Sequence, residues 1–207
     1  MIGITHFETF LIAGILLNIT PGNDTIFILT RSIAHGQKAG IMSVLGISTG
    51  SLIHTIFAAL GLSIIVAQSV LLFHLLKYAG AAYLLYMGYK MLTEKTLLNT
   101  ERAAAVKTND HLRIYKDGVF TNVLNPKVAL FFIAFLPQFI DPTVKNTVWP
   151  FLVLGITFTI TGALWCLFLA IFASGIFAKL KENKQISGYI NKICGAVFIG
   201  LGLKVAI

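Results

Sequence analysis

Two short stretches of this 207-residue sequence place polar and ionisable residues inside long apolar segments. The first is Asn18-Ile19-Thr20-Pro21-Gly22-Asn23-Asp24, and the second is Asn122-Val123-Leu124-Asn125-Pro126-Lys127. Proline lacks an amide hydrogen and clashes with the preceding turn, so each stretch is predicted to interrupt a helix. Thr20-Pro21 and Asn125-Pro126 also have the pattern of a helix N-cap followed by proline at the first helical position.

An interrupted helix leaves backbone groups free to bind a solute. The half-helix before the break ends in free carbonyls, and the half-helix after it begins with free amides and the positive end of the helix dipole. A zwitterion matches both, with its carboxylate at the amides and its ammonium at the carbonyls near Leu17 and Leu124. The alternative is that both prolines only kink their helices for packing. The predicted substrate-binding residues are Asn18, Thr20, Pro21, Gly22, Asn23, Asp24, Asn122, Asn125, Pro126 and Lys127.

Ionisable groups in such apolar surroundings are costly and indicate function. Asp24 and Lys127 follow the two breaks. They either neutralise each other, or Asp24 holds the substrate amine or a proton. His54 lies near the middle of the next apolar segment and is a candidate proton relay, with a histidine hydrogen-bonded inside the bundle as the alternative. Asp24 and His54 are therefore the proton-coupling candidates.

The segments that carry these residues have the length and composition of membrane-spanning helices. The chain is 57% hydrophobic and 12% charged, whereas a soluble domain carries about 25% charged residues. Crossing the hydrocarbon of a bilayer takes about 20 apolar helical residues. Long apolar segments are Phe7–Leu29, Ile41–Ala67, Val70–Leu92, Gly118–Ile140, Val148–Ala178 and Ile186–Ile207. The predicted fold class is an all-α integral membrane protein with six transmembrane helices, in which helices 1 and 4 are broken at prolines.

The distribution of basic residues predicts the topology. The segments after helices one, three and five contain twelve of the 16 basic residues: Arg31, Lys38, Lys90, Lys95, Arg102, Lys107, Arg113, Lys116, Lys179, Lys181, Lys184 and Lys192. The positive-inside rule places these segments in the cytoplasm, so both termini are predicted outside a bacterial inner membrane. Because the basic residues are split among three loops, the net charge of +8 does not predict a nucleic-acid partner.

The longest polar stretch divides the chain into two halves. Residues 93–116 are predicted to be a cytoplasmic linker between repeat 1 (residues 1–92) and repeat 2 (residues 117–207). Both repeats belong to a single transmembrane transporter domain of residues 1–207. Because each half has three helices, the two repeats would be inverted relative to each other, as in many secondary transporters.

Several motifs together resemble a known family. They are Thr20-Pro21-Gly22, Arg31, Gly36, Gly40, Gly46, Gly50, Asn125-Pro126-Lys127, Ala129-Leu130-Phe131-Phe132 and Phe135-Leu136-Pro137-Gln138-Phe139. With these residues the chain resembles the lysine exporter (LysE/RhtB) family over nearly its whole length. The resemblance implies export of amino acids such as lysine, homoserine or threonine, coupling to the proton motive force, and a homodimer. The family usually has a second proline after Pro21-Gly22, where this chain has Asn23.

Two other functions fit the residues of this sequence less well. A thiol–disulfide carrier needs cysteines at matching positions in both halves, but Cys166 and Cys194 lie in the fifth and sixth predicted helices. A metal-cation exporter needs several His, Asp, Glu or Cys on facing helices, and only His54 and Asp24 lie at membrane depth. The sequence therefore predicts an amino-acid exporter that is not an enzyme and has no cofactor or metal site. Export of a metal cation or another small solute by the same superfamily is the alternative.

Overall fold

The computed structural model describes residues 3–64, 70–93, 110–141, 143–144, 148–182, 192–193, 195–200 and 202–203. The α-helices named here are α1 (Phe7–Ile19), α2 (Asn23–His35), α3 (Gln37–Phe57), α5 (Val70–Thr93), α6 (His111–Val123), α7 (Pro126–Leu130) and α8 (Val148–Glu182). Three short elements are η1 (Ala58–Leu62) and η3 (Phe131–Phe135), both π-helical, and the 3₁₀ turn η4 (Leu136–Phe139). In the described residues the fold is thus helical, with one isolated antiparallel bridge between Ile4 and Ile140.

Two pairs of consecutive helices change direction at the proline-containing stretches. The axes of α1 and α2 differ by 48°, and those of α6 and the Pro126–Phe139 segment differ by 46°. Helices Gln37–Leu62 and Val148–Phe172 are each long and apolar enough to cross a membrane, and counting each bent pair as one span gives up to four spans. The third predicted span falls on α5, and much of the sixth lies outside the described residues. Six spans in two inverted repeats therefore stay a prediction.

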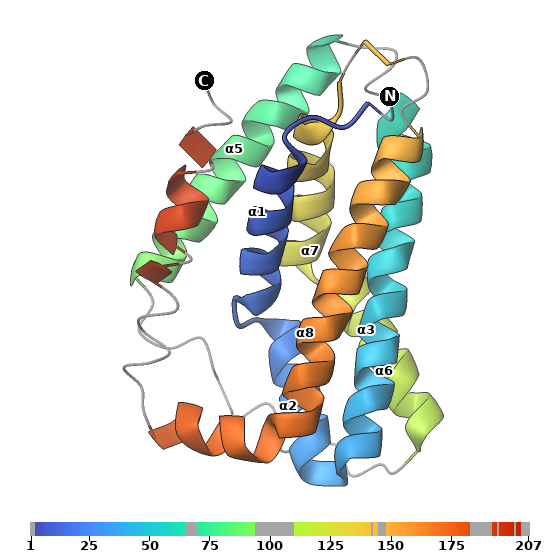
Figure 1. Cartoon of the computed structure of the whole chain (residues 1–207), viewed down its shortest axis with the longest axis vertical. Coiled ribbons are helices and arrows are strands. Elements are labelled where there is room, and N and C mark those ends of the chain that lie inside the picture. Colours follow the sequence, from blue (N-terminus) through green and yellow to red (C-terminus); the bar gives the residue numbers. More distant parts are fainter. Residues whose placement is uncertain are drawn as a thin grey trace.

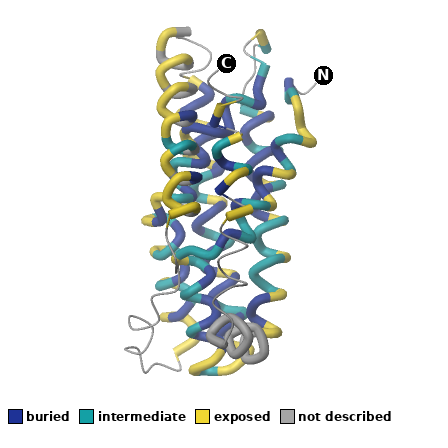
Figure 2. The backbone as a smooth tube through the Cα atoms, turned by 90° about the vertical axis from the view of Figure 1, so that its left-hand side faces the viewer, coloured by how far each residue is buried: buried dark blue, intermediate teal, exposed yellow. Residues whose placement is uncertain are grey.

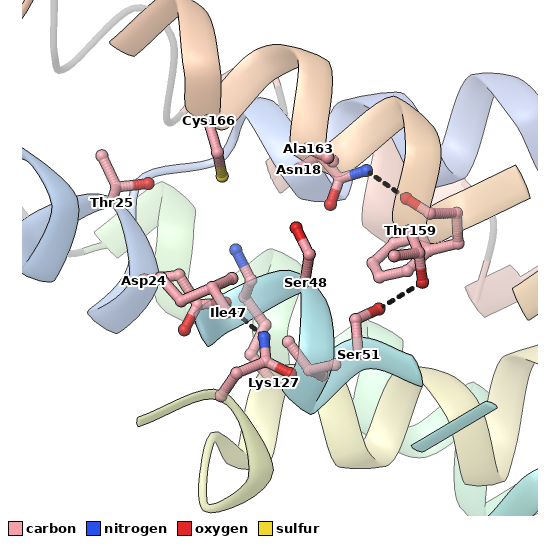
Figure 3. A pocket seen from close by; sticks show the side chains of 14 residues that line it. Asn18, Asp24, Thr25, Ile47, Ser48, Ser51, Lys127, Thr159, Ala163 and Cys166 are labelled. Carbon is pink, nitrogen blue, oxygen red and sulfur yellow. Dashed lines mark hydrogen bonds between the residues drawn. The ribbon is translucent and has the colours of Figure 1, made fainter. Parts of the chain in front are cut away.

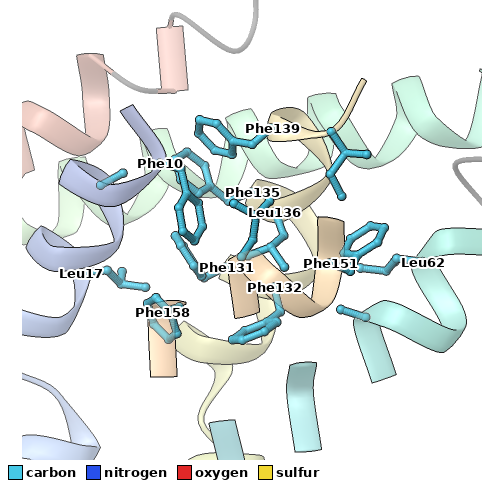
Figure 4. Packing of buried hydrophobic residues seen from close by; sticks show 14 of the residues in the cluster. Phe10, Leu17, Leu62, Phe131, Phe132, Phe135, Leu136, Phe139, Phe151 and Phe158 are labelled. Carbon is cyan, nitrogen blue, oxygen red and sulfur yellow. The ribbon is translucent and has the colours of Figure 1, made fainter. Parts of the chain in front are cut away.

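The helices pack around α3 and α8 (Figure 1). Helix α3 contacts α6 and α8, and α8 also contacts α1 and α2, while α5 packs on η3. The main apolar core is rich in aromatic residues of the Phe131–Phe139 segment, and Phe10 of α1 and Phe158 of α8 pack against them (Figure 4). The ring centroids of Phe131 and Phe158 are 4.6 Å apart. Such pairs add to the free energy gained from burying their area, so this core holds the two bent helix pairs together.

The outer faces of the bundle are apolar. Figure 2 shows exposed residues along the outside of the helices and buried ones within. Among the exposed side chains are Phe57, Leu60 and Leu71, whose relative exposures are 65%, 61% and 70%. Soluble monomers rarely leave so much contiguous apolar surface in water. Together with the apolar helices, this surface indicates a multi-pass membrane protein.

Two boundaries differ from the sequence prediction because the helices continue through charged residues. Arg31 lies inside α2 and is buried, with its Nη2 3.1 Å from Asp117 Oδ2 and its guanidinium 5.3 Å from the Phe27 ring. Helix α6 begins at His111, so residues 111–116 are helical and not part of a linker. Its N-cap is Asp110, whose side chain accepts hydrogen bonds from the amides of Leu112 and Arg113. Residues 94–109 of the predicted linker lie outside the described part.

Helices α3 and α6 approach most closely at two glycines. A β-carbon on Gly46 would clash with the backbone carbonyl of Tyr115 and lie 3.0 Å from the α-carbon of Gly118. Small residues of this kind allow helix backbones to pack together in membranes. The close contact that α3 makes at Gly46 is therefore with α6.

Replacing Gly46 by alanine should destabilise the protein by about 1–3 kcal/mol, because overpacking forces the two backbones apart. Alanine by itself favours a helix over glycine by roughly 1 kcal/mol. Gly61→Ala is the matched control, since a β-carbon there meets nothing within 4 Å. Melting temperatures in detergent should fall for Gly46→Ala and stay level or rise for Gly61→Ala. Equal melting temperatures of the two variants would contradict the α3–α6 contact.

Candidate functional site

A small cavity of about 40 Å³ lies between the two breaks. Figure 3 shows side chains from α1, α2, α3, α7 and α8 converging on it. The lining residues are Asn18, Asp24, Thr25, Ile47, Ser48, Ser51, Asn122, Lys127, Val128, Phe158, Thr159, Gly162, Ala163 and Cys166. Of these lining residues, only Asp24 is acidic and only Lys127 is basic. The cavity therefore has one formal charge of each sign on its wall.

Lys127 connects the second break to the first. Its ammonium donates hydrogen bonds to the backbone carbonyls of Leu17 and Thr20, both at 2.9 Å. These carbonyls belong to the C-terminal turn of α1, where the helix dipole favours a cation. The sequence predicted that the carbonyl near Leu17 would face a substrate ammonium. In this structure it accepts a hydrogen bond from the ammonium of Lys127.

Asp24 makes the reciprocal connection from the first break to the second. Its two carboxylate oxygens accept hydrogen bonds from the side-chain amides of Asn122, at 2.9 Å, and Asn125, at 3.0 Å. Asp24 lies in the first turn of α2, where the helix dipole favours an anion. Each charged residue thus has neutral hydrogen-bond partners on the opposite bent helix pair.

The two breaks are capped differently. At the second break Asn125 is the N-cap, its side-chain oxygen accepts from the Lys127 amide at 3.1 Å, and Pro126 starts α7. This matches the predicted capping pattern. At the first break the prediction was wrong, because α2 begins at Asn23 and its N-cap is Gly22 in an extended conformation. The Thr20 hydroxyl instead donates back to the Leu16 carbonyl of α1 at 2.7 Å.

This difference changes where an anion could bind. The N-cap of α2 is Gly22, which makes no side-chain hydrogen bond to the first amides of the helix. At α7 the side chain of Asn125 already accepts from the amide of Lys127. Of the two half-helix sites that the sequence predicted for a carboxylate, the start of α2 is therefore the better candidate.

His54 lies behind the cavity wall. Its Nε2 is 3.2 Å from the backbone carbonyl of Asn122, and its ring stacks on Phe132 with centroids 5.6 Å apart. His54 does not line the cavity. Asn122 connects it to Asp24, because the carbonyl of Asn122 faces His54 while the side-chain amide of Asn122 donates to Asp24. A role in proton coupling stays a prediction.

The predicted site residues divide into three groups. Asn18, Asp24, Asn122 and Lys127 line the cavity. Asn125 and Thr20 are buried behind it and hydrogen-bond to the two charged residues. Pro21, Gly22, Asn23 and Pro126 form the breaks without lining the cavity, and Asn23 and Pro126 are exposed. That these residues bind substrate is still a prediction.

Helices α3 and α8 contribute a wall that the sequence analysis missed. The hydroxyls of Ser51 and Thr159 are 2.8 Å apart (Figure 3). The side-chain amide of Asn18 lies 3.3 Å from the Thr161 hydroxyl. Ser48 and Ser51 are three residues apart and share a helix face, and that spacing was a usable signal. Cys166, in the fifth predicted helix, also borders the cavity.

The chain is similar in sequence to known membrane proteins. The chain matches the family model for LysE type translocators over residues 15–207. The uncharacterized membrane protein YrhP of Bacillus subtilis (strain 168) is 34% identical over 196 residues, covering 91% of this chain and 92% of the relative. A leucine efflux protein of Salmonella typhimurium (strain LT2) is 30% identical over 204 residues, covering 99% and 96%. The leucine efflux protein of Enterobacter sp. (strain 638) is 29% identical with the same coverage. No solved structure matches the chain.

Proposed function

Because the chain belongs to the LysE type translocator family, we propose that it is a secondary transporter that exports neutral amino acids from the bacterial cytoplasm. One observation carries this proposal. The cavity between the two helix breaks has one acid, Asp24, and one base, Lys127, on its wall. Ionisable groups at membrane depth indicate a path for polar solutes, and an amino-acid zwitterion carries the same two charges as this wall.

The lining of the cavity also favours a neutral side chain. Asp24 is the single carboxylate on the wall, so no second carboxylate lines the cavity to receive the side-chain ammonium of lysine in addition to an α-ammonium. Ile47, Val128 and Phe158 supply apolar surface for an aliphatic group. Two of the relatives compared are named as leucine efflux proteins. Leucine is therefore the first substrate to test.

The cavity must widen before it can hold such a molecule. A buried water needs roughly 10–15 Å³ of cavity volume. The cavity of about 40 Å³ therefore has room for only a few waters. An amino acid such as leucine has nine non-hydrogen atoms. Binding of leucine therefore requires the helices around the cavity to move apart. Opening toward either side by movement of the bent helix pairs would be the alternating access of secondary transporters.

Coupling to the proton motive force would use groups next to this cavity. Asp24 lines the cavity, and Asn122 links it to His54. Carboxylates and histidines in such chains relay protons in other transporters. Asp24 and His54 therefore remain our candidates for the proton path, and a homodimer remains the expectation from the family resemblance.

The alternative of a metal-cation exporter has less support. A transition-metal site needs several nitrogen, sulfur or oxygen ligands close together. Within the described part of the chain, no three His, Cys, Asp or Glu residues form such a group. The Lys127 ammonium on the cavity wall would also repel a cation.

An efflux screen tests the proposed function. Bacteria that express the protein are preloaded with dipeptides, and the amino acids that appear outside are identified and timed. We expect leucine or another neutral aliphatic amino acid to leave faster than from cells expressing the Asp24→Asn variant. Unchanged efflux of all amino acids, with faster efflux of a metal cation, would favour the alternative.

The orientation in the membrane is a separate proposal, based on the excess of basic residues in the segments after helices one, three and five. Cysteines can be introduced at the exposed positions His111 and Thr143 in a protein that lacks its native cysteines. In intact cells the two cysteines should differ in their labelling by a thiol reagent. An impermeant thiol reagent should label the Thr143→Cys variant and not the His111→Cys variant. Labelling in the opposite pattern would reverse the topology.

A further inference from the structure

The carbonyls at the end of α1 already hold an ammonium group. Lys127 Nζ lies 2.9 Å from the carbonyl oxygens of both Leu17 and Thr20. A primary ammonium has three hydrogen-bond donors and no acceptor, and the α-ammonium of an amino acid has the same chemistry. We infer that Lys127 is a tethered substitute for the substrate's ammonium, which occupies the ammonium subsite in the empty carrier and leaves it when substrate binds. This inference rests on the proposed function.

The structure suits a side chain that leaves its site while its backbone stays in place. The amide of Lys127 is held by the side chain of Asn125 at 3.1 Å, within the N-terminal turn of α7. The rest of the side chain is a flexible four-carbon stem, and it borders the cavity. It runs past Gly22, where an added β-carbon would lie 3.4 Å from Nζ and 3.8 Å from Cε. Rotation of this one side chain therefore displaces the ammonium as the cavity widens for the substrate.

An empty carrier without this cation would be left with two unfavourable features. The α1 carbonyls would lose a donor at a depth where lipid cannot replace it. Asp24, which accepts hydrogen bonds from two neutral amides, would lose the nearby positive charge that lines the same cavity. A substrate-loaded carrier avoids both problems, because the substrate brings its own ammonium. Lys127 should therefore matter for the return of the empty carrier and much less for movement of the loaded one.

This distinction separates two modes of transport. Net efflux requires the carrier to return empty after each release. Exchange of internal for external amino acid requires only that the substrate-loaded carrier switches its opening from one side of the membrane to the other. A tethered ammonium thus predicts that removal of Lys127 stops net efflux and spares exchange, whereas a purely structural lysine or a direct ligand of the substrate is needed for both.

The test uses the purified protein in liposomes, with labelled leucine or the amino acid found in the efflux screen. Lys127→Met keeps an unbranched side chain that is one non-hydrogen atom shorter, and it removes the charge. We expect net efflux to fall by at least about tenfold while exchange stays within roughly threefold of the unmodified protein. Lys38→Met is the matched control, since Lys38 is exposed at the start of α3, and it should change neither mode.

The possible outcomes separate the two proposals. Loss of net efflux and exchange together in Lys127→Met, or retention of both, would overturn the role of Lys127. An unmodified protein that moves no amino acid in either mode would instead refute the proposed function.

A second measurement does not depend on whether the variant folds. Reductive methylation by formaldehyde and cyanoborohydride in large excess, read by mass spectrometry, reports how accessible each lysine amine is. In the unmodified protein, methylation of Lys127 relative to the exposed Lys38 should rise by at least about threefold when substrate is added, because the ammonium leaves the carbonyls in the bound state. Unchanged or reduced methylation of Lys127 would overturn the inference.

Discussion

Asp24→Asn should abolish net efflux, reducing its rate by at least about tenfold, which corresponds to about 1.4 kcal/mol. Both carboxylate oxygens of Asp24 accept hydrogen bonds from side-chain amides, those of Asn122 and Asn125. An asparagine side chain has one acceptor oxygen and one amino group, so one of these hydrogen bonds would become a contact between two donors. The substitution would also remove the negative charge that shares the cavity with Lys127.

Transport rates per folded molecule, measured in proteoliposomes, check this expectation. Glu8→Gln is the matched control, because it makes the same carboxylate-to-amide change at an exposed position of α1. It should leave the efflux rate unchanged. Normal efflux in Asp24→Asn would show that the carboxylate serves packing alone.

The double variant Asp24→Asn with Lys127→Met distinguishes function from charge balance. Removing one partner of a buried charged pair leaves the other charge uncompensated, whereas removing both does not. If the double variant regains net efflux that both single variants have lost, the two charges are needed only to neutralise each other. We expect no recovery, because each residue has a separate role at the cavity.

Removal of the α-carboxylate from the substrate should weaken its binding by about tenfold or more, since hydrogen bonds to a charged group contribute about 1.5–3 kcal/mol. The expected partners are the first amides of α2, which have no side-chain cap, together with the positive end of the helix dipole. Changing the aliphatic side chain, from leucine to norleucine or valine, should have a smaller effect because Ile47, Val128 and Phe158 offer only apolar contact.

Competition against labelled leucine in proteoliposomes measures these differences. The compounds to compare are leucine, leucine methyl ester and 3-methylbutylamine, which is leucine without its carboxyl group. Norleucine is the matched control, because it keeps both charges. If the amine competes as well as leucine does, the start of α2 is not the carboxylate site, and a polyamine or metal-cation exporter becomes the better hypothesis.

The sequence by itself determined those features that depend on local chemistry. Long apolar segments predicted membrane helices because hydrocarbon requires them. Prolines in polar surroundings predicted interruptions in two of these segments, because a proline amide cannot donate, and two bent helix pairs lie at these stretches. The cap at Asn125 was also readable, since its partner is the amide of Lys127, only two residues away. The family resemblance followed from the same short motifs.

The tertiary structure decided which of these groups meet. Lys127 binds carbonyls of Leu17 and Thr20, 110 and 107 positions away in the sequence, and Asp24 binds amides 98 and 101 positions away. No local pattern specifies such pairs, because they depend on how the two bent helix pairs pack. The same holds for the wall that α8 adds to the cavity and for the burial of Arg31 against Asp117. The N-cap of α2 is Gly22 and not the predicted Thr20, whose hydroxyl donates to a carbonyl of α1 instead.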